Sequence, residues 1–262
     1  MLLLMLVLTS PAVYADQAAV EASAAAQVQG VAASCDAGGF AVAIDIGHTP
    51  QEPGAISARG VPEYDFNERL ARDVEAALHA MGLKRAFIVA DRARGRLTLT
   101  GRTRIAADAG AQLFLSVHHD SVQPQYLSGW EFDGETRRYS DRFAGFSLFV
   151  SEQNPRFTDS LAFGQRLGRE LRARGFVPTL HHAEPIPGEN RPLLNPELGL
   201  YRFDGLAVLR TASMPAVLLE AGIIVNRDEE KRLGSAAHRA VMADAIVAAV
   251  LETCAEMEAA RH

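Results

Sequence analysis

Three polar residues follow apolar runs at the positions where buried strands are expected to end. His48 comes after the segment AVAIDIG, His118 lies near the end of LFLSVHH, and Glu220 closes PAVLLE. Because ligands of open α/β sheets bind outside the carboxyl ends of the strands, we expect these side chains to face one crevice. Two histidines and a carboxylate are a common set of zinc ligands, and catalytic zinc sites keep a fourth position for water. The pattern therefore favours a zinc site at this edge of the sheet.

Spacing alone does not identify the carboxylate that completes such a site. Glu63 stands just before the helix that follows the His48 loop. Four other carboxylates have the same chemistry, namely Asp45, Asp65, Asp120 and Glu220. Since a single histidine at a strand end is more often structural than a ligand, it is the joint placement of the residues that favours a metal site.

The elements that must hold these residues follow from the hydrophobic pattern. Compact apolar runs alternate with amphipathic stretches from Phe40 onward, which is typical of a parallel sheet covered by helices. We expect strands over 40–46, 86–92, 112–120, 145–152, 206–210 and 215–222. We expect helices over 63–82, 99–109 and 160–175, with Asp159 as the cap of the third, and then a short and a long helix between Asn226 and Met257. The expected fold class is α/β, a single domain with a mostly parallel twisted sheet flanked by helices on both faces.

The residues before this domain have a different composition. Residues 1–15 are mostly apolar and end in Val13-Tyr14-Ala15, which is typical of a signal peptide and falls short of the roughly 20 residues that span a bilayer. Residues 16–39 are rich in alanine, glycine and glutamine, and we expect a flexible linker there. We expect residues 40–262 to form the catalytic domain. We also expect the protein to be exported to the periplasm or cell surface.

Charge and cysteine usage narrow the classes further. A formal net charge of −6 gives the protein as a whole no electrostatic reason to bind nucleic acid or an anionic membrane surface. The two cysteines, Cys35 and Cys254, form a disulfide if the chain is exported, or else remain two buried thiols. Their spacing does not decide between these alternatives.

Three blocks of the sequence carry a more specific signal. The first is AIDIGHTPQEPGAISARGVPEYDFNERLARDVEAAL, the second DRARGRLTLTGRTRIAADAGAQLFLSVHHD, and the third LAVLRTASMPAVLLEAGIIVNRDEEKRL. In this order they resemble the zinc-dependent N-acetylmuramoyl-L-alanine amidases of the Amidase_3 family. The matching residues include Gly47-His48, Pro53-Gly54, Gly60, Glu63, Asp65-Phe66-Asn67, Leu99, Arg102, Ser116-Val117-His118, Met214-Pro215, Glu220, Gly222 and Asn226.

The resemblance, which spans 40–233, implies specific roles. It implies one zinc ion bound by His48, Glu63 and His118, with Glu220 as the catalytic carboxylate. It also implies hydrolysis of the amide between N-acetylmuramic acid and L-alanine in peptidoglycan, for cell-wall remodelling or daughter-cell separation. Departures from the family pattern are His119 and Asp120 after the ligand histidine, and Ala107 and Gln112 in the preceding helix and strand. His119 leaves a choice between two neighbouring histidines.

The implied chemistry explains why these residue types are needed. Amide hydrolysis requires an activated water, stabilisation of the charge on the tetrahedral intermediate, and a proton for the departing nitrogen. Zinc supplies the first two. Glu220, off the metal but near it, would accept the proton of the water and deliver it to the leaving amine. The alternative for Glu220 is a helix cap or a buried ion-pair partner.

A long irregular segment, 176–200, contains five prolines and no hydrophobic period. Loops of this length are usually functional or mobile. His181, His182, Glu184 and Glu189 in this segment are expected to bind the stem peptide. A second hypothesis is that Glu184 or Glu189 gates the zinc site until an activator protein displaces it, and a solvated loop is the third alternative.

Two other functional classes remain open from the sequence. A zinc peptidase that cuts within the peptidoglycan stem peptide would use the same metal and the same general base. A non-catalytic wall-binding module would not need Glu220.

Overall fold

A seven-stranded sheet runs through the molecule in the order β2-β1-β3-β9-β6-β8-β7. The computed structural model describes residues 35–93 and 97–260. The strands of this sheet are β1 (Val42–Ile46), β2 (Phe87–Ile88), β3 (Leu113–Asp120), β6 (Ser147–Val150), β7 (Leu193–Asn195), β8 (Leu200–Arg202) and β9 (Ala216–Ile223). Neighbouring strands are parallel except for β6 with β9 and β7 with β8. The expected mostly parallel α/β sheet is therefore confirmed.

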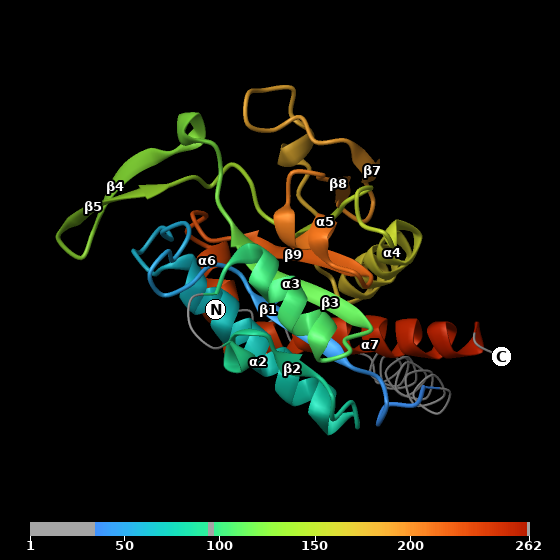
Figure 1. Cartoon of the computed structure of the whole chain (residues 1–262). Coiled ribbons are helices and arrows are strands. Elements are labelled where there is room, and N and C mark those ends of the chain that lie inside the picture. Colours follow the sequence, from blue (N-terminus) through green and yellow to red (C-terminus); the bar gives the residue numbers. More distant parts are fainter. Residues whose placement is uncertain (1–34, 94–96, 261–262) are drawn as a thin grey trace, which may run out of the picture.

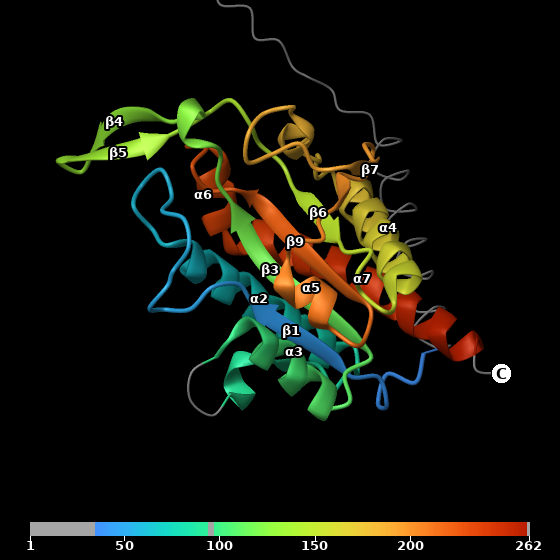
Figure 2. The same ribbon diagram turned by 45° about the horizontal axis from the view of Figure 1, so that its top comes forward.

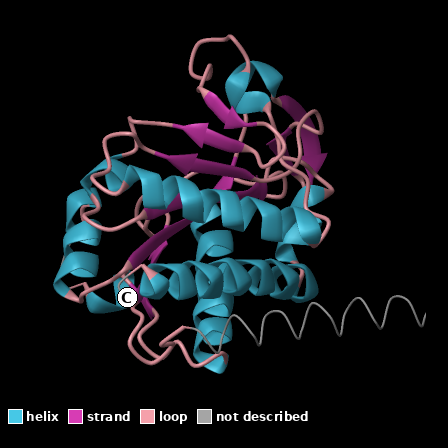
Figure 3. Ribbon diagram, turned by 90° about the vertical axis from the view of Figure 1, so that its right-hand side faces the viewer, coloured by secondary structure: helices cyan, strands magenta, loops and turns pink. Residues whose placement is uncertain are grey.

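Helices cover both faces of this sheet (Figures 1 and 2). One face carries α2 (Glu63–Ala80), α4 (Phe157–Ala173) and α7 (Ala236–Ala259), and the other carries the shorter α3 (Leu99–Asp108) and α5 (Ala207–Thr211). Figure 3 shows the long helices lying side by side over the strands. In α2 the apolar residues four apart, Phe66, Leu70, Val74 and Leu78, are all buried, as the sequence period predicts.

Strand periodicity decides which side chains reach the functional edge. In β3, Leu113, Leu115 and Val117 pack with the long helices, whereas Phe114 packs with α3 and α5. Because successive side chains of a strand point to opposite faces, His118 and Asp120 lie on the α3 and α5 face. His119 lies on the α2 face.

Three expectations about local structure are wrong. Residues 206–210 were expected as a strand but contribute to helix α5, whose Val208 and Leu209 are buried. A short apolar run is compatible with both a buried strand and a buried helical turn, so the apolar pattern did not distinguish the two. The cap of α4 is Arg156 rather than Asp159, which lies in the first turn and accepts a hydrogen bond from the Arg156 guanidinium. The strand expected over 86–92 is only two residues long and continues into a 3₁₀ turn, η1 (Ala90–Arg92).

Other elements were not foreseen. A two-stranded hairpin of β4 (Ser128–Phe132) and β5 (Glu135–Tyr139) projects from the body of the molecule (Figure 1). The segment 176–200 contains a 3₁₀ turn, η3 (His181–Ala183), and strand β7, so it is only partly irregular. The remaining elements are η2 (Pro124–Tyr126) and α6 (Glu229–Gly234).

The expected signal peptide, 1–15, and linker residues 16–34 lie outside the described residues. Residues 35–39 form a turn that leads into β1, and the Cys35 side chain is buried. Among the described residues, no helix combines the length and the apolar character needed to cross a membrane.

Cys35 and Cys254 form a disulfide that ties the residues before β1 to α7 across a sequence separation of 219. Replacing both by serine is expected to lower the free energy of unfolding by about 2–4 kcal/mol, because the cross-link restricts the unfolded chain. Urea unfolding followed by circular dichroism measures this difference. A reductant should shift the midpoint of the wild type and leave that of the double variant unchanged; equal midpoints without reductant would show that the bridge contributes no stability.

Candidate metal centre and active site

His48, Glu63 and His118 converge at the carboxyl end of the sheet. The Glu63 carboxylate lies between the two rings, with Oε2 3.0 Å from His48 Nε2 and Oε1 3.0 Å from His118 Nδ1. The three residues offer ligand atoms that all lie within 4.8 Å of one another. Atoms that share a tetrahedral zinc ion at about 2.0–2.1 Å are roughly 3.3 Å apart, so this spacing suits a metal ion. The structure thus brings together the three residues that the sequence pointed to.

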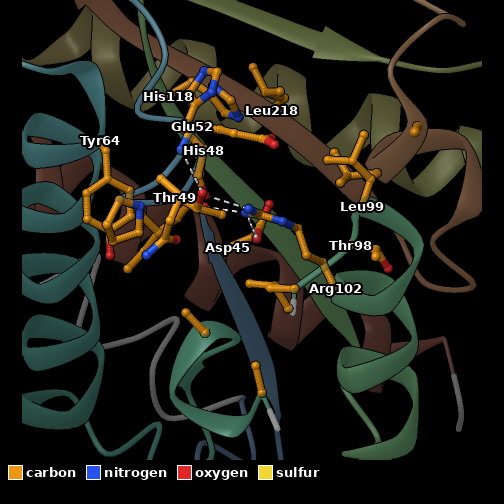
Figure 4. Close-up of a pocket in the computed structure, with 18 of the residues that line it drawn as sticks. Asp45, His48, Thr49, Glu52, Tyr64, Thr98, Leu99, Arg102, His118 and Leu218 are labelled. Carbon is orange, nitrogen blue, oxygen red and sulfur yellow. Dashed lines mark hydrogen bonds and ion pairs between the residues drawn. The ribbon is translucent and has the colours of Figure 1, made fainter. Parts of the chain in front are cut away.

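A buried charge network holds the backbone of the His48 loop. Arg102 donates hydrogen bonds to the carbonyl oxygens of Ile46 and His48, and its Nη1 lies 2.8 Å from Asp45 Oδ1 (Figure 4). Ser116 Oγ donates to the other oxygen of Asp45, at 2.8 Å. His48 itself has φ 68°, a left-handed conformation that costs a non-glycine residue about 1–3 kcal/mol and needs support from its surroundings. Asp45 therefore positions the loop, and it belongs to neither of the metal-capable groups found among the described residues.

Two glycines leave room for the side chains of His48, Glu63 and His118. A Cβ atom on Gly47 would lie 2.5 Å from atoms of the His118 ring. A Cβ atom on Gly54, where φ is +80°, would lie 2.4 Å from Glu63 Oε2 and 2.6 Å from the His48 ring. Glycine is thus required at both positions, because the backbone lies so close to these three side chains.

Gly47→Ala tests this close packing, because the backbone of Gly47 is not in a left-handed conformation and the added methyl group acts through its volume alone. We expect the displaced His118 ring to lower metal affinity by about 10–100-fold, as loss of a partner that orients a ligand does. Zinc titration against a chromophoric chelator measures the effect. Gly234→Ala, at the end of α6, where the backbone is not left-handed and nothing lies within 4 Å of the added methyl group, is the control. Unchanged affinity in Gly47→Ala would mean that the His118 ring moves without consequence.

Glu63 is buried and is held as a carboxylate. Burial raises the pKa of Glu63, but hydrogen bonds and charges from His118 and His48 outweigh it and leave the pKa well below its usual range. Asn67, one turn along α2, donates from Nδ2 to Glu63 Oε1 at 3.1 Å and to the carbonyl of Gly47 at 3.1 Å. This amide joins Glu63 of α2 to the loop that carries His48.

The choice between His118 and His119 is decided by the two faces of β3. His119 Nδ1 lies 2.8 Å from Asn67 Oδ1, and its ring packs on Phe66. Burial lowers the pKa of His119 to about 3, so the ring is neutral at physiological pH. His119 therefore contacts Asn67 on the α2 face of the sheet. The ring that contacts Glu63 Oε1 through Nδ1 belongs to His118.

Glu220 lies on β9 directly beside His118, with which it pairs in register. Side chains at paired positions of neighbouring strands leave the sheet on the same face, so Glu220 faces the same crevice. Its Oε2 is buried without a hydrogen-bond partner among the described residues. Burial raises the pKa of Glu220 well above its usual value, and the charges of Asp120 and Glu63 raise it further. The structure therefore places a protonatable carboxyl group beside the three converging residues.

A cavity of about 1030 Å³ adjoins His48 and His118. Figure 4 shows both histidines at one end, with Tyr64 on one side and Leu99 on the other. Its lining combines the loop 48–52 with apolar side chains from three segments, namely Leu97, Leu99, Leu206, Val208 and Leu218. Pockets of roughly this size bind small molecules or segments of larger ones.

The segment 176–200 does not reach His48, Glu63 or His118 through its carboxylates. Glu184 accepts a hydrogen bond from Tyr126 Oη at 2.9 Å, and Glu189 lies 2.9 Å from His182 Nδ1. The hypothesis that Glu184 or Glu189 occupies the metal site is therefore wrong for this conformation. Asp65 belongs to neither of the metal-capable groups found among the described residues, whereas Asp120 joins a second one.

A comparison with known families identifies the family of this chain. The model of the Amidase_3 family, described as N-acetylmuramoyl-L-alanine amidase, matches residues 42–252. The chain belongs to this amidase family. The matched range contains all the elements that carry His48, Glu63, His118 and Glu220.

Named relatives agree with this assignment to the amidases. The chain is 27% identical over 223 residues to a probable N-acetylmuramoyl-L-alanine amidase, AmiB, of Haemophilus influenzae, covering 76% of this chain and 48% of the relative. It is 27% identical over 244 residues to N-acetylmuramoyl-L-alanine amidase AmiA of Escherichia coli, covering 80% of this chain and 74% of AmiA. The chain thus spans about half of one relative and three quarters of the other.

Solved amidase structures share the fold. The N-acetylmuramyl-L-alanine amidase Ami1 of Mycobacterium smegmatis aligns with a TM-score of 0.63 at 22% identity, over 83% of this chain and 98% of Ami1. The catalytic domain of CwlV from Bacillus (Paenibacillus) polymyxa var. colistinus aligns with a TM-score of 0.59 at 24% identity, over 81% of this chain and 97% of that domain. At these identities the likeness concerns the arrangement of sheet and helices.

The sequence pattern did not predict the buried pair of Asp45 and Arg102 that positions the His48 loop. The pattern offers Asp45 only as a candidate ligand and Arg102 only as part of a motif. The signal was present, because a buried carboxylate in the apolar strand AVAIDIG requires a charged or polar partner. The partner's position along the chain is not encoded in that strand.

Proposed function

We propose that this amidase is zinc-dependent and hydrolyses the amide between the N-acetylmuramic acid lactyl group and L-alanine of peptidoglycan, with His48, Glu63 and His118 as metal ligands and Glu220 as the catalytic carboxylate. The observation that carries the proposal is the convergence of these three donors beside Glu220 within the range that matches the family.

The donor set of the three residues fits zinc. Two imidazoles and one carboxylate are usual for catalytic zinc, and the charged Glu63 balances part of the charge of the ion. Asn67 orients the Glu63 carboxylate, as partners of ligating groups commonly do. When bound, zinc lowers the pKa of water to about 7 and polarises a carbonyl group.

Glu220 is suited to move protons in this reaction. Burial raises the pKa of Glu220, which makes its carboxylate a stronger base toward the attacking water, and the carboxyl group formed by that transfer can then donate its proton to the departing amine. The cavity beside His48 and His118, with its apolar wall, would hold the part of the substrate next to the scissile amide.

Cellular context is also part of the proposal. Peptidoglycan lies outside the cytoplasm, so the activity requires export to the periplasm or cell surface, consistent with the signal expected at 1–15 and with the disulfide. We keep a protein activator among the partners to be tested. A fold neighbour at 16% identity, the CwlD amidase of Clostridioides difficile, was solved in complex with the GerS lipoprotein.

Digestion of purified peptidoglycan tests the proposed bond specificity. New termini are identified by mass spectrometry, and we expect intact stem peptides with a free N-terminal L-alanine. Cuts within the stem peptide would instead indicate a zinc peptidase, and binding to the wall without any new termini would indicate a wall-binding module. A chelator added to the same digest should stop product release.

A further inference from the structure

Asp120, His181 and His182 form a second group of side chains that share no member with the first. Their ligand atoms lie within 4.8 Å of one another. Asp120 Oδ2 is 2.8 Å from His182 Nε2 and 3.2 Å from His181 Nε2. These separations match those between ligands of one tetrahedral ion, about 3.3 Å, as closely as the separations in the first group do.

The atoms that converge are buried and lack aligned partners. The side chains of Asp120, His181 and His182 are 14%, 1% and 11% exposed. Within the described residues, Asp120 Oδ2 and both histidine Nε2 atoms make no hydrogen bond of acceptable geometry, although they lie close together. Polar atoms buried in this way cost free energy unless something satisfies them. One cation between them would satisfy all three.

The opposite nitrogens of both rings are already engaged. His182 Nδ1 lies 2.9 Å from Glu189 Oε2, and His181 Nδ1 lies 2.9 Å from Thr179 Oγ1. Gln123 Nε2 donates to the other oxygen of Glu189 at 2.7 Å. A histidine that binds a metal almost always donates its second ring N–H to a carboxylate or another acceptor. These contacts turn both Nε2 atoms toward Asp120.

The group is held in place by secondary structure and aromatic packing. Asp120 ends β3, two residues after His118 and therefore about 6.6 Å further along the strand. Turn η3 supplies both histidines, whose rings pack on Phe143 and Phe149 with centroids 5.1 and 5.0 Å apart. The ligands of this second group are thus preorganised beside the proposed zinc site and do not belong to it.

We propose that Asp120, His181 and His182 bind a second divalent cation, separate from the ion at His48, Glu63 and His118. Two imidazoles and a carboxylate suit zinc better than calcium or magnesium, which take mainly oxygen ligands. The bound ion ties the segment 176–200 to the end of β3, close to Glu220. Sites with three protein ligands keep a fourth position for water.

A proton on His182 would compete with a metal ion for binding to this group. Burial lowers the pKa of His182, but the charges of Asp120 and Glu189 outweigh this effect and raise it to about 9. A cluster held together by that proton alone would be an ion-pair network that binds no metal. The two alternatives differ in the number of ions bound per chain.

Zinc titration of the full chain, freed of metal by a chelator and then desalted, distinguishes them. We expect two zinc ions per wild-type chain and one in the His181→Ala/His182→Ala variant, counted by elemental analysis after desalting. His48→Ala should also bind one ion, and the combination of all three substitutions none. The control His238→Gln, on α7, should keep two.

Glu189→Gln provides a test that does not depend on removing a ligand. The amide preserves the size of the side chain but weakens the partner of His182, so we expect the affinity of one ion to fall about 10–100-fold while the other is unchanged. One ion per wild-type chain that is retained in the double histidine variant would overturn the second site. Two ions that both disappear in the double variant, with the fold intact by circular dichroism, would overturn the independence of the sites. One ion per wild-type chain that is lost in the double histidine variant but kept in His48→Ala would count against the proposed function and leave this inference standing.

Discussion

Glu220→Gln is expected to reduce amide hydrolysis by about 10²–10⁴-fold and to leave zinc binding at His48, Glu63 and His118 unchanged. The amide is nearly the same size as the carboxylate, so packing at the end of β9 is retained, but it can neither accept the proton of the attacking water nor deliver one to the amine. Initial rates on purified peptidoglycan, compared at equal zinc content, measure the effect. The rate should fall in kcat, because the missing proton transfer belongs to the chemical step.

Glu252→Gln is a matched control for this prediction. Glu252 lies on α7 on the far side of the sheet, and burial raises the pKa of this carboxyl as well. Replacement of this half-buried carboxylate should leave the rate unchanged. If Glu220→Gln keeps the full rate, the carboxyl group takes no part in proton transfer and the mechanism proposed above is wrong.

The sheet and the convergence of the first metal-capable group were predictable because each depends on a local pattern. The apolar runs that became β1, β3 and β9 are each followed or ended by one polar residue of the site. In a parallel sheet these ends meet at one edge, so strand order was not needed to predict that His48, His118 and Glu220 come together. The resemblance then singled out Glu63 among the carboxylates, and the structure places it between the two rings.

The faces of β3 show how an ambiguity in the sequence is removed by the fold. His118 and His119 are chemically identical neighbours, and motif matching alone left a choice between them. The two-residue period of a strand sends one ring to Glu63 and the other to Asn67. The choice depends on which face the helix α3 covers, which is a property of the whole fold.

Other features depend on contacts that no local pattern specifies. His181 and His182 meet Asp120 because η3 folds back over the end of β3, some 60 residues away along the chain as the numbering shows. The β4–β5 hairpin was missed although its turn carries a clear signal. Asp133-Gly134, with φ values of 52° and 75°, is the dipeptide favoured in two-residue hairpin turns.

His48→Ala is expected to remove the catalytic ion and abolish turnover on peptidoglycan. Loss of a partner that only orients a ligand costs about 10–100-fold in metal affinity, so loss of a ligand itself should cost more than about 100-fold. The remaining Glu63 and His118 keep their mutual contact, and the ring of His48 is partly exposed, so the fold should survive. Elemental analysis should show one zinc ion fewer per chain.

His79→Ala is the control for this variant, because His79 lies in the last turn of α2, where its Nε2 lies 2.9 Å from the carbonyl of Ala86, away from the ligands. It should keep both the ion and the rate. The decisive comparison is between metal content and turnover in the same preparation. Turnover that persists in His48→Ala after the ion is lost would mean that hydrolysis does not need this ion. Retention of the ion with loss of turnover would instead assign His48 to the substrate rather than to the metal.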